Sequence, residues 1–264
     1  MPRIGILVVA YNAESTLQKV IQRIPADVYA KIEEIFVFDD ASKDRTYEAG
    51  REAMLAPYGE KLRVFRNPVN LMYGGNQRKG YEYAIRRGLD IVVLLHGDGQ
   101  YAPEVMQELL TPLEGGQADM VMGSRMMIPG AALKGNMPLY KYFGNKVLTW
   151  TENTLIGQNF TEFHSGYRAY SVSALAEMPL EQMTWNWHFD TQVILEFLRR
   201  GLRIKEVPIP TYYGDEICHV NGIPYAWNCV KETMKYAVAD RWRRKPSHAD
   251  SEQSDAPLPL APRP

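Results

Sequence analysis

A short apolar run that ends in a carboxylate-bearing turn is the feature of this sequence that most directly suggests chemistry. Residues 91–95 read IVVLL, without the alternation of a half-exposed strand, and HGDGQ follows at 96–100. Such a run is typical of a strand buried on both faces of a parallel sheet. Ligands bind at the carboxyl ends of strands in such sheets. Asp98 and Gln100 therefore offer two oxygen ligands suited to one Mg²⁺ or Mn²⁺ ion.

Three more clusters of polar side chains follow predicted strands in the same way. They are Tyr11 and Asn12, Asp39 and Asp40, and Asn67 and Asn70. Helix capping or turn formation explains Asn12 and Asp40 when each is taken alone. Because the carboxyl ends of parallel strands share one edge of a sheet, the four clusters together predict a polar cleft that binds a ligand.

The type of ligand is narrowed by two motifs that the sequence lacks. It contains neither a G-x-x-x-x-G-K-[ST] phosphate loop nor a G-x-G-x-x-G after the first predicted strand. We therefore expect a nucleotide held by carboxylates and by a divalent ion that bridges its diphosphate. Asp39 would accept a hydrogen bond from a base N–H or a ribose hydroxyl, and Asp98 with Gln100 would hold the ion.

The first half of the chain alternates apolar runs with helical patterns, and these elements must position the four clusters. The succession predicts an α/β fold with a mostly parallel central sheet flanked by helices. Asn12 is the expected N-cap of the first helix. The expected strands are 4–9, 35–38, 62–65, 91–95 and 120–122, and the expected helices are 13–24, 44–56, 75–87 and 103–110.

The second half of the chain is less regular. Residues 123–138, rich in Gly, Met and Pro, are expected to form a mobile loop. We predict one domain over 1–245, followed by a disordered Pro-rich tail at 246–264. The remaining expected elements are an amphipathic stretch at 139–156, a helix at 190–200, a strand at 202–209 and a final helix at 225–244.

The composition is that of an ordinary globular protein. Of the 264 residues 45% are hydrophobic and 23% are charged, and the net charge of −1 argues against nucleic-acid binding. Two cysteines are too few for a disulfide framework and fit a reducing compartment. No run approaches the roughly 20 apolar residues of a membrane span, and the residues after 4–10 do not suit signal-peptide cleavage. We therefore expect a cytoplasmic protein, with peripheral contact to the cytoplasmic membrane face left open.

Six motifs occur in the order typical of one enzyme family. They are VVAYNAESTL, VFDDASKDRT, NPVNLMYGGNQRKGYEYA, HGDGQYAPE, GSR and FHSGYRAYS. On these motifs the chain resembles the family 2 glycosyltransferases over about residues 3–215, and within them the dolichyl- and polyprenyl-phosphate sugar synthases. The resemblance implies the nucleotide-diphospho-sugar transferase (GT-A) fold, inversion at the anomeric carbon and a Mg²⁺ or Mn²⁺ cofactor. It also implies a UDP- or GDP-sugar donor and a polyprenyl-phosphate acceptor.

The resemblance assigns roles to particular residues. Asp39 and Asp40 match carboxylates that bind the base and the ribose, and Asp98 and Gln100 match the second acid and the glutamine of the metal motif. The implied donor site comprises Ala10, Tyr11, Asn12, Asp39, Asp40, Asn67, Asn70, Gly74, Gln77, Lys79, Gly97 and Asp98.

The metal motif departs from the family pattern D-x-D-x-Q at its first acid, which is His96 in this chain. A neutral imidazole can still ligate the metal or bind a phosphate, but it makes the site less negative. We therefore expect weaker metal binding, or binding that depends more on the donor diphosphate. It is equally open that His96 only ends its strand.

Basic residues in the second half of the chain would bind the acceptor phosphate. Arg125 in GSR and Arg168 in HSGYR match basic positions of the family. Lys141 and Asn145 fall near an arginine and a serine that the branch carries on an amphipathic helix, and His219 is a further candidate.

The nature of the acceptor decides whether a base is needed. A phosphate is already anionic, so positioning and metal stabilisation of the leaving charge suffice. A saccharide or other hydroxyl acceptor would require Glu162 or Asp190 to remove its proton; with Asp98 these are the catalytic candidates.

Two further functions are compatible with a nucleotide-binding cleft. One is a non-catalytic nucleotide-sugar binder, which the departure at His96 leaves open. The second is a sugar-1-phosphate nucleotidyltransferase, which has a related sheet. That class typically carries G-x-G-T-R-[LM] after its first strand, where this chain has Tyr11, Asn12 and Ala13.

The last helix is the predicted place of any membrane contact. Its apolar stripe, which we expect to pack on the domain, is Trp227, Val230, Met234, Ala237 and Val238. Its basic end, which we expect to meet anionic lipid, is Arg241, Trp242, Arg243, Arg244 and Lys245.

Overall fold

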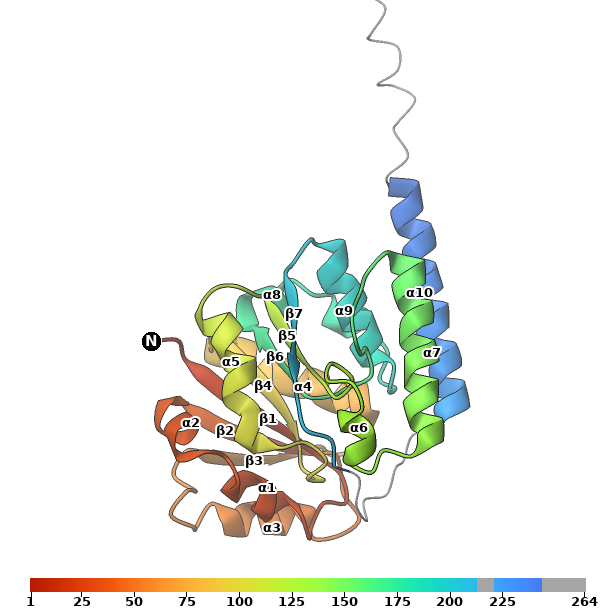
Figure 1. The fold of residues 1–264 in the computed structure, drawn as a ribbon. Helices are drawn as coiled ribbons and strands as arrows, with labels where there is room; N and C mark the ends of the chain where they lie inside the picture. Colours follow the sequence, from red (N-terminus) through yellow and green to blue (C-terminus); the bar gives the residue numbers. More distant parts are fainter. Residues whose placement is uncertain (213–220, 244–264) are drawn as a thin grey trace, which may run out of the picture.

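The apolar runs of the sequence become neighbouring strands of one sheet in the computed structural model, which describes residues 1–212 and 221–243. Seven strands of this part of the chain lie in the order β3-β2-β1-β4-β6-β5-β7 (Figure 1). Their bounds are β1 Ile4–Ala10, β2 Glu34–Asp39, β3 Leu62–Arg66, β4 Ile91–His96, β5 Met120–Ser124, β6 Arg168–Ser171 and β7 Ile204–Pro208. The predicted α/β class with a mostly parallel sheet is confirmed.

Strand β6 is the exception to parallel order, because it runs antiparallel to both β4 and β5. Its four residues fall in the HSGYRAYS motif, which the sequence marked only as a basic position. A strand of four residues is too short to show a period of two. The crossover between β5 and β6 contains α6 (Ala131–Lys134), so the prediction of one irregular loop over 123–138 is wrong in part.

Helices cover both faces of the sheet (Figure 1). Alternate residues of β1 point to opposite faces, so Ile6 packs into one apolar core and Leu7 into the other. The first core is closed by α1 (Leu17–Gln22), α2 (Ala26–Lys31), α3 (Thr46–Ala53) and α5 (Met106–Glu114), with a 3₁₀ turn at Pro103–Val105. The second core is closed by α4 (Met72–Arg87), α8 (Val172–Ala176) and α9 (Phe189–Arg199), with a 3₁₀ turn at Leu180–Gln182.

The first helix begins later than predicted. Its N-cap is Thr16, and Asn12 lies outside the helix with a positive φ of 51°. The Oδ1 atom of Asn12 instead accepts a hydrogen bond from the backbone N–H of Lys43, 2.9 Å away. The predicted capping role of Asn12 is therefore wrong, since its side chain stabilises the neighbouring loop after β2.

Two long helices, α7 (Leu139–Ile156) and α10 (Gly222–Arg243), lie side by side at one side of the molecule (Figure 1). Helix α10 packs on α7 and α9 through Cys229, Thr233 and Tyr236, which are buried. Within the predicted stripe Trp227, Met234 and Val238 are exposed instead, so the prediction that it packs on the domain is wrong for these three. The side chains of 241–245 and the tail at 246–264 lie outside the described residues.

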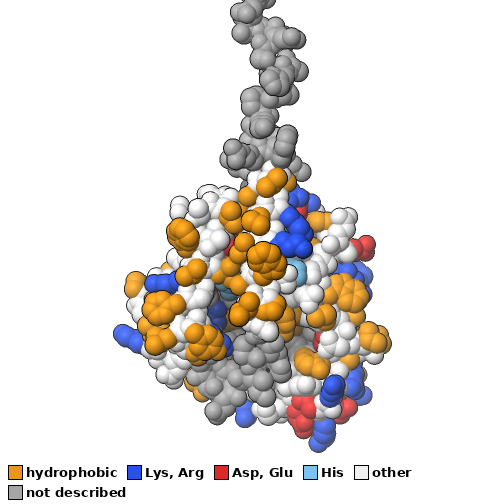
Figure 2. Space-filling model, turned by 90° about the vertical axis from the view of Figure 1, so that its right-hand side faces the viewer, with side chains coloured by type: hydrophobic (Ala, Val, Ile, Leu, Met, Phe, Trp, Pro, Cys, Tyr) orange, Lys and Arg blue, Asp and Glu red, His pale blue; other side chains and the backbone are white. Residues whose placement is uncertain are grey.

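The exposed side of these two helices is apolar, and Figure 2 shows the hydrophobic side chains gathered there. We call this surface the apolar face; its residues are Leu139, Tyr140, Phe143, Val147 and Trp150 of α7 and Ile223, Trp227, Met234 and Val238 of α10. Across 1–212 and 221–243, no helix combines the length and the apolar character that crossing a membrane requires.

Candidate active site

The register of the sheet brings the predicted donor residues to one edge. Strand β1 lies between β2 and β4, and all three are parallel. Ala10 pairs with Asp39, and Val9 pairs with His96. The polar residues that follow these three strands therefore gather at their carboxyl ends, where ligands bind in open α/β sheets.

Asp39 is buried at the end of β2 and keeps one oxygen without a hydrogen bond. Its Oδ1 accepts hydrogen bonds from the backbone and hydroxyl of Ser42. Its Oδ2 lies 3.4 Å from Nε of Arg66 and has no hydrogen-bond partner among the described residues. A buried acceptor without a donor is costly, so this oxygen is suited to a donor group of a bound ligand.

Asp40 holds the loop after β3 and is less suited to contact a ligand. Its Oδ1 accepts from Asn67 Nδ2 at 2.9 Å and from the backbone N–H of Leu71 at 2.8 Å. Asn70 donates to the Asp40 carbonyl at 3.1 Å. Burial raises the pKa of Asp40. Asn67 and Asn70 thus shape the wall of the site through Asp40.

Asp98 lies on the turn after β4 and is exposed to solvent. Its Oδ1 accepts from the backbone N–H of Gln100 at 2.9 Å, and Gly99 between them has a φ of +82° that suits glycine. The hydroxyl of Thr16 donates to the carbonyl of Gly97 at 2.7 Å and fixes the start of the turn. An exposed carboxylate beside an amide oxygen fits the hard ligands that Mg²⁺ and Mn²⁺ take.

One ring nitrogen of His96 contacts another side chain of the protein. Its Nε2 lies 3.3 Å from the hydroxyl of Tyr73. A Cβ on Gly166 would lie 2.7 Å from the ring, so only glycine fits above the imidazole. Burial lowers the pKa of His96 and favours the neutral ring. The contacts of Nε2 leave Asp98 and Gln100 as the better candidates for the metal ligands.

Tyr73 connects His96 to a buried ion pair. Its hydroxyl donates to Asp190 Oδ2 at 2.8 Å, and Asp190 Oδ1 lies 3.7 Å from Nη1 of Arg168. The guanidinium of Arg168 also donates to the carbonyls of Phe163, Ser165 and Asp190 itself. Arg168 has no exposed surface. The predicted contact of Arg168 with the acceptor phosphate therefore does not fit, because every direction of its guanidinium faces protein.

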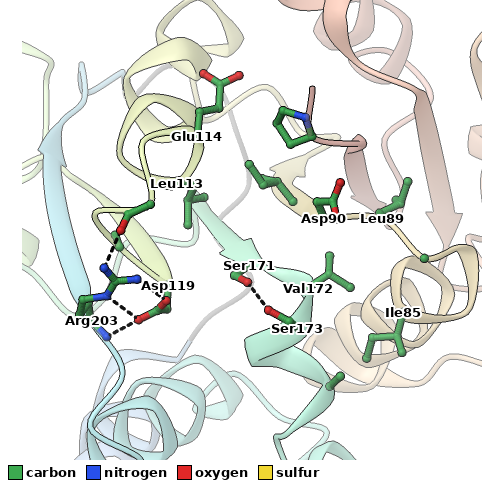
Figure 3. A pocket seen from close by; sticks show the side chains of 16 residues that line it. Ile85, Leu89, Asp90, Leu113, Glu114, Asp119, Ser171, Val172, Ser173 and Arg203 are labelled. Carbon is green, nitrogen blue, oxygen red and sulfur yellow. Dashed lines mark hydrogen bonds and ion pairs between the residues drawn. The ribbon is translucent and has the colours of Figure 1, made fainter.

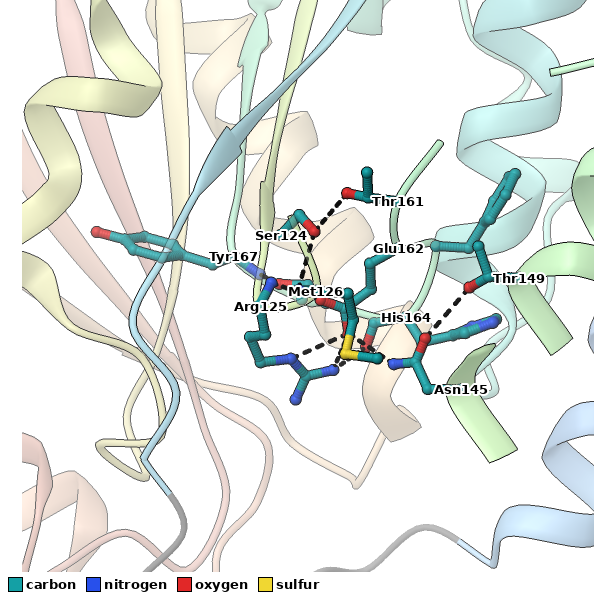
Figure 4. A network of polar contacts seen from close by, with 12 residues as sticks. Ser124, Arg125, Met126, Asn145, Thr149, Thr161, Glu162, His164 and Tyr167 are labelled. Atoms are coloured by element: carbon teal, nitrogen blue, oxygen red, sulfur yellow. Dashed lines mark hydrogen bonds and ion pairs between the residues drawn. The ribbon is translucent and has the colours of Figure 1, made fainter. Parts of the chain in front are cut away.

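A second buried ion pair joins Arg125, after β5, to Glu162 (Figure 4). The backbone N–H of Arg125 donates to Glu162 Oε2 at 2.7 Å, and its guanidinium donates to Oε1. Asn145 of α7 donates to the same Oε1 at 2.7 Å. Burial alone raises the pKa of Glu162, but Arg125 and these hydrogen bonds lower it below its ordinary value. A buried carboxylate with a lowered pKa is poorly suited to act as a base.

Lys141 lies one helical turn before Asn145 on α7, so it is on the same side of that helix as the Arg125–Glu162 pair. Its side chain is partly exposed. Arg125 and Lys141 are therefore the two predicted acceptor residues that the structure brings to one region. His219 lies outside the described residues.

Three residues of the implied donor site lie on α4. Gly74 is buried, and a Cβ there would lie 2.6 Å from Phe189 and from the Thr184 carbonyl. Gln77 is buried and accepts from the hydroxyl of Tyr81 at 2.8 Å. Lys79 lies 3.4 Å from Glu82 on α4. Gly74 and Gln77 are thus buried in this structure, and their contact with the donor stays a prediction.

A cavity of about 510 Å³ lies at the opposite edge of the sheet (Figure 3). Its lining includes Asp90, Asp119 and Arg203, which precede β4, β5 and β7, and Arg203 pairs with Asp119 at 2.9 Å. None of the predicted site residues lines it. We assign it no part in the chemistry.

Three residues that shape the site, namely Ser42, Tyr73 and Gly166, were not predicted from the sequence. Ser42 follows the two aspartates closely, and Tyr73 and Gly166 stand inside two of the six family motifs. Their roles depend on contacts between elements distant in sequence, such as Tyr73 with Asp190. No local pattern reports such contacts.

An open α/β sheet with a polar site at the carboxyl edge of its parallel strands is the arrangement of a nucleotide-binding enzyme. The chain matches the family model described as Glycosyl transferase family 2 over residues 5–178. It therefore belongs to glycosyltransferase family 2, which decides against a sugar-1-phosphate nucleotidyltransferase.

Relatives with known names support the same branch of the family. A UDP-N-acetylglucosamine–dolichyl-phosphate N-acetylglucosaminyltransferase of Methanococcus voltae is 29% identical over 222 residues, covering 80% of this chain and 86% of the relative. An undecaprenyl-phosphate mannosyltransferase of Micrococcus luteus is 29% identical over 249 residues, covering 91% and 96%. The resemblance to the dolichyl- and polyprenyl-phosphate sugar synthases is confirmed.

Among solved structures, glucosyl-3-phosphoglycerate synthase from Mycobacterium tuberculosis in complex with Mn²⁺, UDP and phosphoglyceric acid is similar in fold. Its TM-score is 0.65 with 17% identity, and the alignment covers 89% of this chain and 78% of that one. At this identity the similarity shows the fold alone, which is GT-A.

We predict that Glu162→Gln destabilises the protein in a pH-dependent way. At neutral pH the free energy of unfolding should fall by about 3–5 kcal/mol, because the buried charge of Arg125 loses its partner. Folding lowers the pKa of Glu162 below its ordinary value of about 4.5. The ion pair of the wild type therefore stabilises the fold fully at pH values above about 4.5, and this stabilisation is lost as the pH falls through the pKa of the folded state. Urea unfolding at pH 7, 5 and 3.5 measures this difference.

The matched control for this prediction is Glu104→Gln. Glu104 pairs with Arg23 at 2.7 Å on the surface, where both side chains are about half exposed. Exposed pairs contribute about 0–1 kcal/mol, so this change should cost little. A pH-independent cost in Glu162→Gln, or an equal cost in the control, would contradict the assignment.

Proposed function

We propose that this protein transfers a sugar from a UDP- or GDP-sugar to a polyprenyl phosphate with inversion at the anomeric carbon. The observation that carries the proposal is the state of the two carboxylates that could act as a base. Glu162 is buried against Arg125, and Asp190 is buried beside Arg168 and Tyr73. Neither is placed to accept a proton from a hydroxyl acceptor, whereas a phosphate acceptor needs no base.

The donor would lie over the carboxyl ends of β1, β2 and β4. Asp39 Oδ2 would accept from the base or the ribose, and exposed Tyr11 and Asn12 would border the nucleotide. Asp98 and Gln100 would hold a Mg²⁺ or Mn²⁺ ion, which when bound neutralises the charge that develops on the leaving diphosphate. The mycobacterial synthase of similar fold, solved in complex with Mn²⁺ and UDP, is consistent with this assignment.

The acceptor phosphate would approach from the side of Arg125 and Lys141. Arg125 is held in position by Glu162, and Asn145 fixes that carboxylate from α7. One phosphate oxygen attacks the anomeric carbon from the face opposite the diphosphate, so the new C–O bond forms as the bond to the leaving oxygen breaks. The residues of this chain contribute orientation and charge to that step, and they transfer no proton.

The central test is sugar transfer by the purified protein. UDP- and GDP-sugars are offered with undecaprenyl phosphate and Mg²⁺ or Mn²⁺, and the lipid product is detected by mass spectrometry. We expect Asp98→Ala to lower the rate by on the order of 100-fold or more, because the leaving charge loses its stabilisation. Asp27→Ala, an exposed acid on α2 at the other edge of the sheet, should keep the wild-type rate. Transfer that survives EDTA, or transfer only to free saccharides, would contradict the proposal.

We further predict that Asp39→Asn weakens binding of free nucleotide by about 1–3 kcal/mol. The amide keeps the volume but presents an N–H where the carboxylate presents only acceptors. Calorimetry with UDP and GDP measures the loss, with Asp27→Asn as the control for a surface charge. An unchanged affinity would remove Asp39 from the nucleotide site.

The apolar face of α7 and α10 is proposed to meet the membrane that holds a polyprenyl acceptor. Contiguous exposed apolar surface is uncommon on soluble proteins and marks a contact site. On α7, Asn145 links this face to the Arg125–Glu162 pair, and Lys141 lies one helical turn before Asn145. A helix pair lying on a bilayer would therefore present the acceptor phosphate to the site.

We predict that flotation with vesicles detects this contact. Phe143→Glu with Trp150→Glu should reduce the bound fraction several-fold, because a charge must then enter the interface. Leu55→Glu, at a residue just after α3 that is even more exposed, should have no effect. Binding that high salt abolishes and these variants do not alter would instead assign the contact to the basic residues 241–245.

A further inference from the structure

A second cluster of ligand-type side chains lies away from the donor site, between α7, α9 and α10. Glu152 of α7, His164 of the loop before β6 and Cys229 of α10 each turn one ligand atom toward the others. These three atoms all lie within 4.8 Å of one another, and Glu152 Oε2 lies 3.0 Å from His164 Nε2. Ligand atoms around a tetrahedral zinc ion are roughly 3.3–3.8 Å apart, given bond lengths of about 2.0–2.3 Å. The distances between the three ligand atoms, from 3.0 Å to at most 4.8 Å, therefore include the range of a zinc site.

The cluster contains buried polar atoms that the protein does not satisfy. Glu152 is fully buried, and neither of its carboxylate oxygens has a hydrogen-bond partner among the described residues. The same holds for His164 Nε2, which is close to Glu152 but not aligned to donate to it. Because buried polar atoms without hydrogen bonds are costly, an ion bound between Glu152 and His164 would satisfy the atoms that their mutual contact leaves without a hydrogen bond.

The outer contacts of the cluster suit metal ligands. Nδ1 of His164 lies 2.9 Å from the hydroxyl of Tyr225, so that hydroxyl can accept from Nδ1–H and leave Nε2 free to bind a metal. The hydroxyl of Thr191 donates to Sγ of Cys229 at 3.3 Å, which stabilises a thiolate. A neutral imidazole, a thiolate and a carboxylate together carry a charge of −2. One divalent ion would make the buried site neutral.

We propose that Glu152, His164 and Cys229 bind one zinc ion at a site separate from that of Asp98. Thiolate, imidazole and carboxylate are the ligand types that zinc takes, whereas Mg²⁺ and Mn²⁺ prefer oxygen alone. A water molecule would complete four-coordination. The proposal does not depend on the sugar-transfer reaction proposed above.

The zinc ion would connect the two surface helices to the catalytic domain. Glu152 lies on α7, Cys229 lies on α10, and His164 lies two residues from Glu162, which holds Arg125. Without a metal, burial lowers the pKa of His164, but the charge of Glu152 outweighs burial and raises that pKa to about 10. A proton would then occupy the place of the ion, and the cluster would be a buried ion pair that ties only α7 to the loop.

The test uses the full chain, purified without a histidine tag, stripped with chelator and dialysed against buffered Zn²⁺. Elemental analysis should find one zinc per chain in the wild type and in Asp98→Ala, which lacks the proposed donor-site ligand. With Co²⁺ as the probe, the protein should show the visible bands of a tetrahedral ion and the near-ultraviolet thiolate-to-cobalt band.

Variants separate this site from adventitious binding. Cys229→Ser should remove the thiolate band and weaken zinc binding at least tenfold, while Cys218→Ser and His188→Ala should change neither. Thr191→Val should weaken binding by about 10-fold or more without removing the band. If Cys229→Ser fails to fold, the cobalt spectra of the wild type and of Cys218→Ser still show whether the thiolate of Cys229 binds the metal. The proposal would be overturned if the wild type showed no thiolate band, or if a folded Cys229→Ser bound zinc as the wild type does. The cluster would then be only the buried ion pair of Glu152 and His164.

Discussion

The burial of Arg168 is the constraint on which the centre of this site depends. Its guanidinium has no exposed surface and donates to three backbone carbonyls, those of Phe163, Ser165 and Asp190. A buried cation is stable only when it is paired and fully hydrogen-bonded, so these carbonyls and the Asp190 carboxylate are fixed by it. Burial by itself lowers the pKa of Arg168, but the charge of Asp190 outweighs burial and raises that pKa. The loop before β6 and the start of α9 are thereby held together by one side chain.

That constraint explains why His96 can stand where the family pattern has an acid. Asp190, fixed by Arg168, accepts from Tyr73, and Tyr73 in turn meets Nε2 of His96. Gly166 leaves room for the ring. A carboxylate at 96 would lie near Asp98 and would add like charge to the site. The imidazole instead continues a polar chain into the domain, and Asp98 remains the exposed carboxylate of the turn.

Residues 162–168 are tied to three other parts of the fold through three separate charged contacts. Glu162 pairs with Arg125 after β5, His164 meets Glu152 of α7, and Arg168 meets Asp190 of α9. Each contact joins this segment to a different element of the fold. Helix α7 carries residues of the apolar face and also Glu152, so the contact with His164 ties this face to the segment before β6.

The sequence by itself determined the sheet, the edge at which the polar clusters gather and the family. Apolar runs such as 91–95 report burial directly, and side chains that follow parallel strands must gather at one edge whatever the details of packing. The position of Asp39 and Asp98 at this edge could therefore be predicted without a structure. The tertiary structure alone decided which residues of the site motifs are buried and which are exposed. Arg168, Gln77 and Gly74 stand in site motifs yet are buried, and Asn12 does not cap its helix. Burial and pairing depend on elements far apart in the chain, such as β6 against β4 or α7 against α10, and no local pattern encodes those contacts.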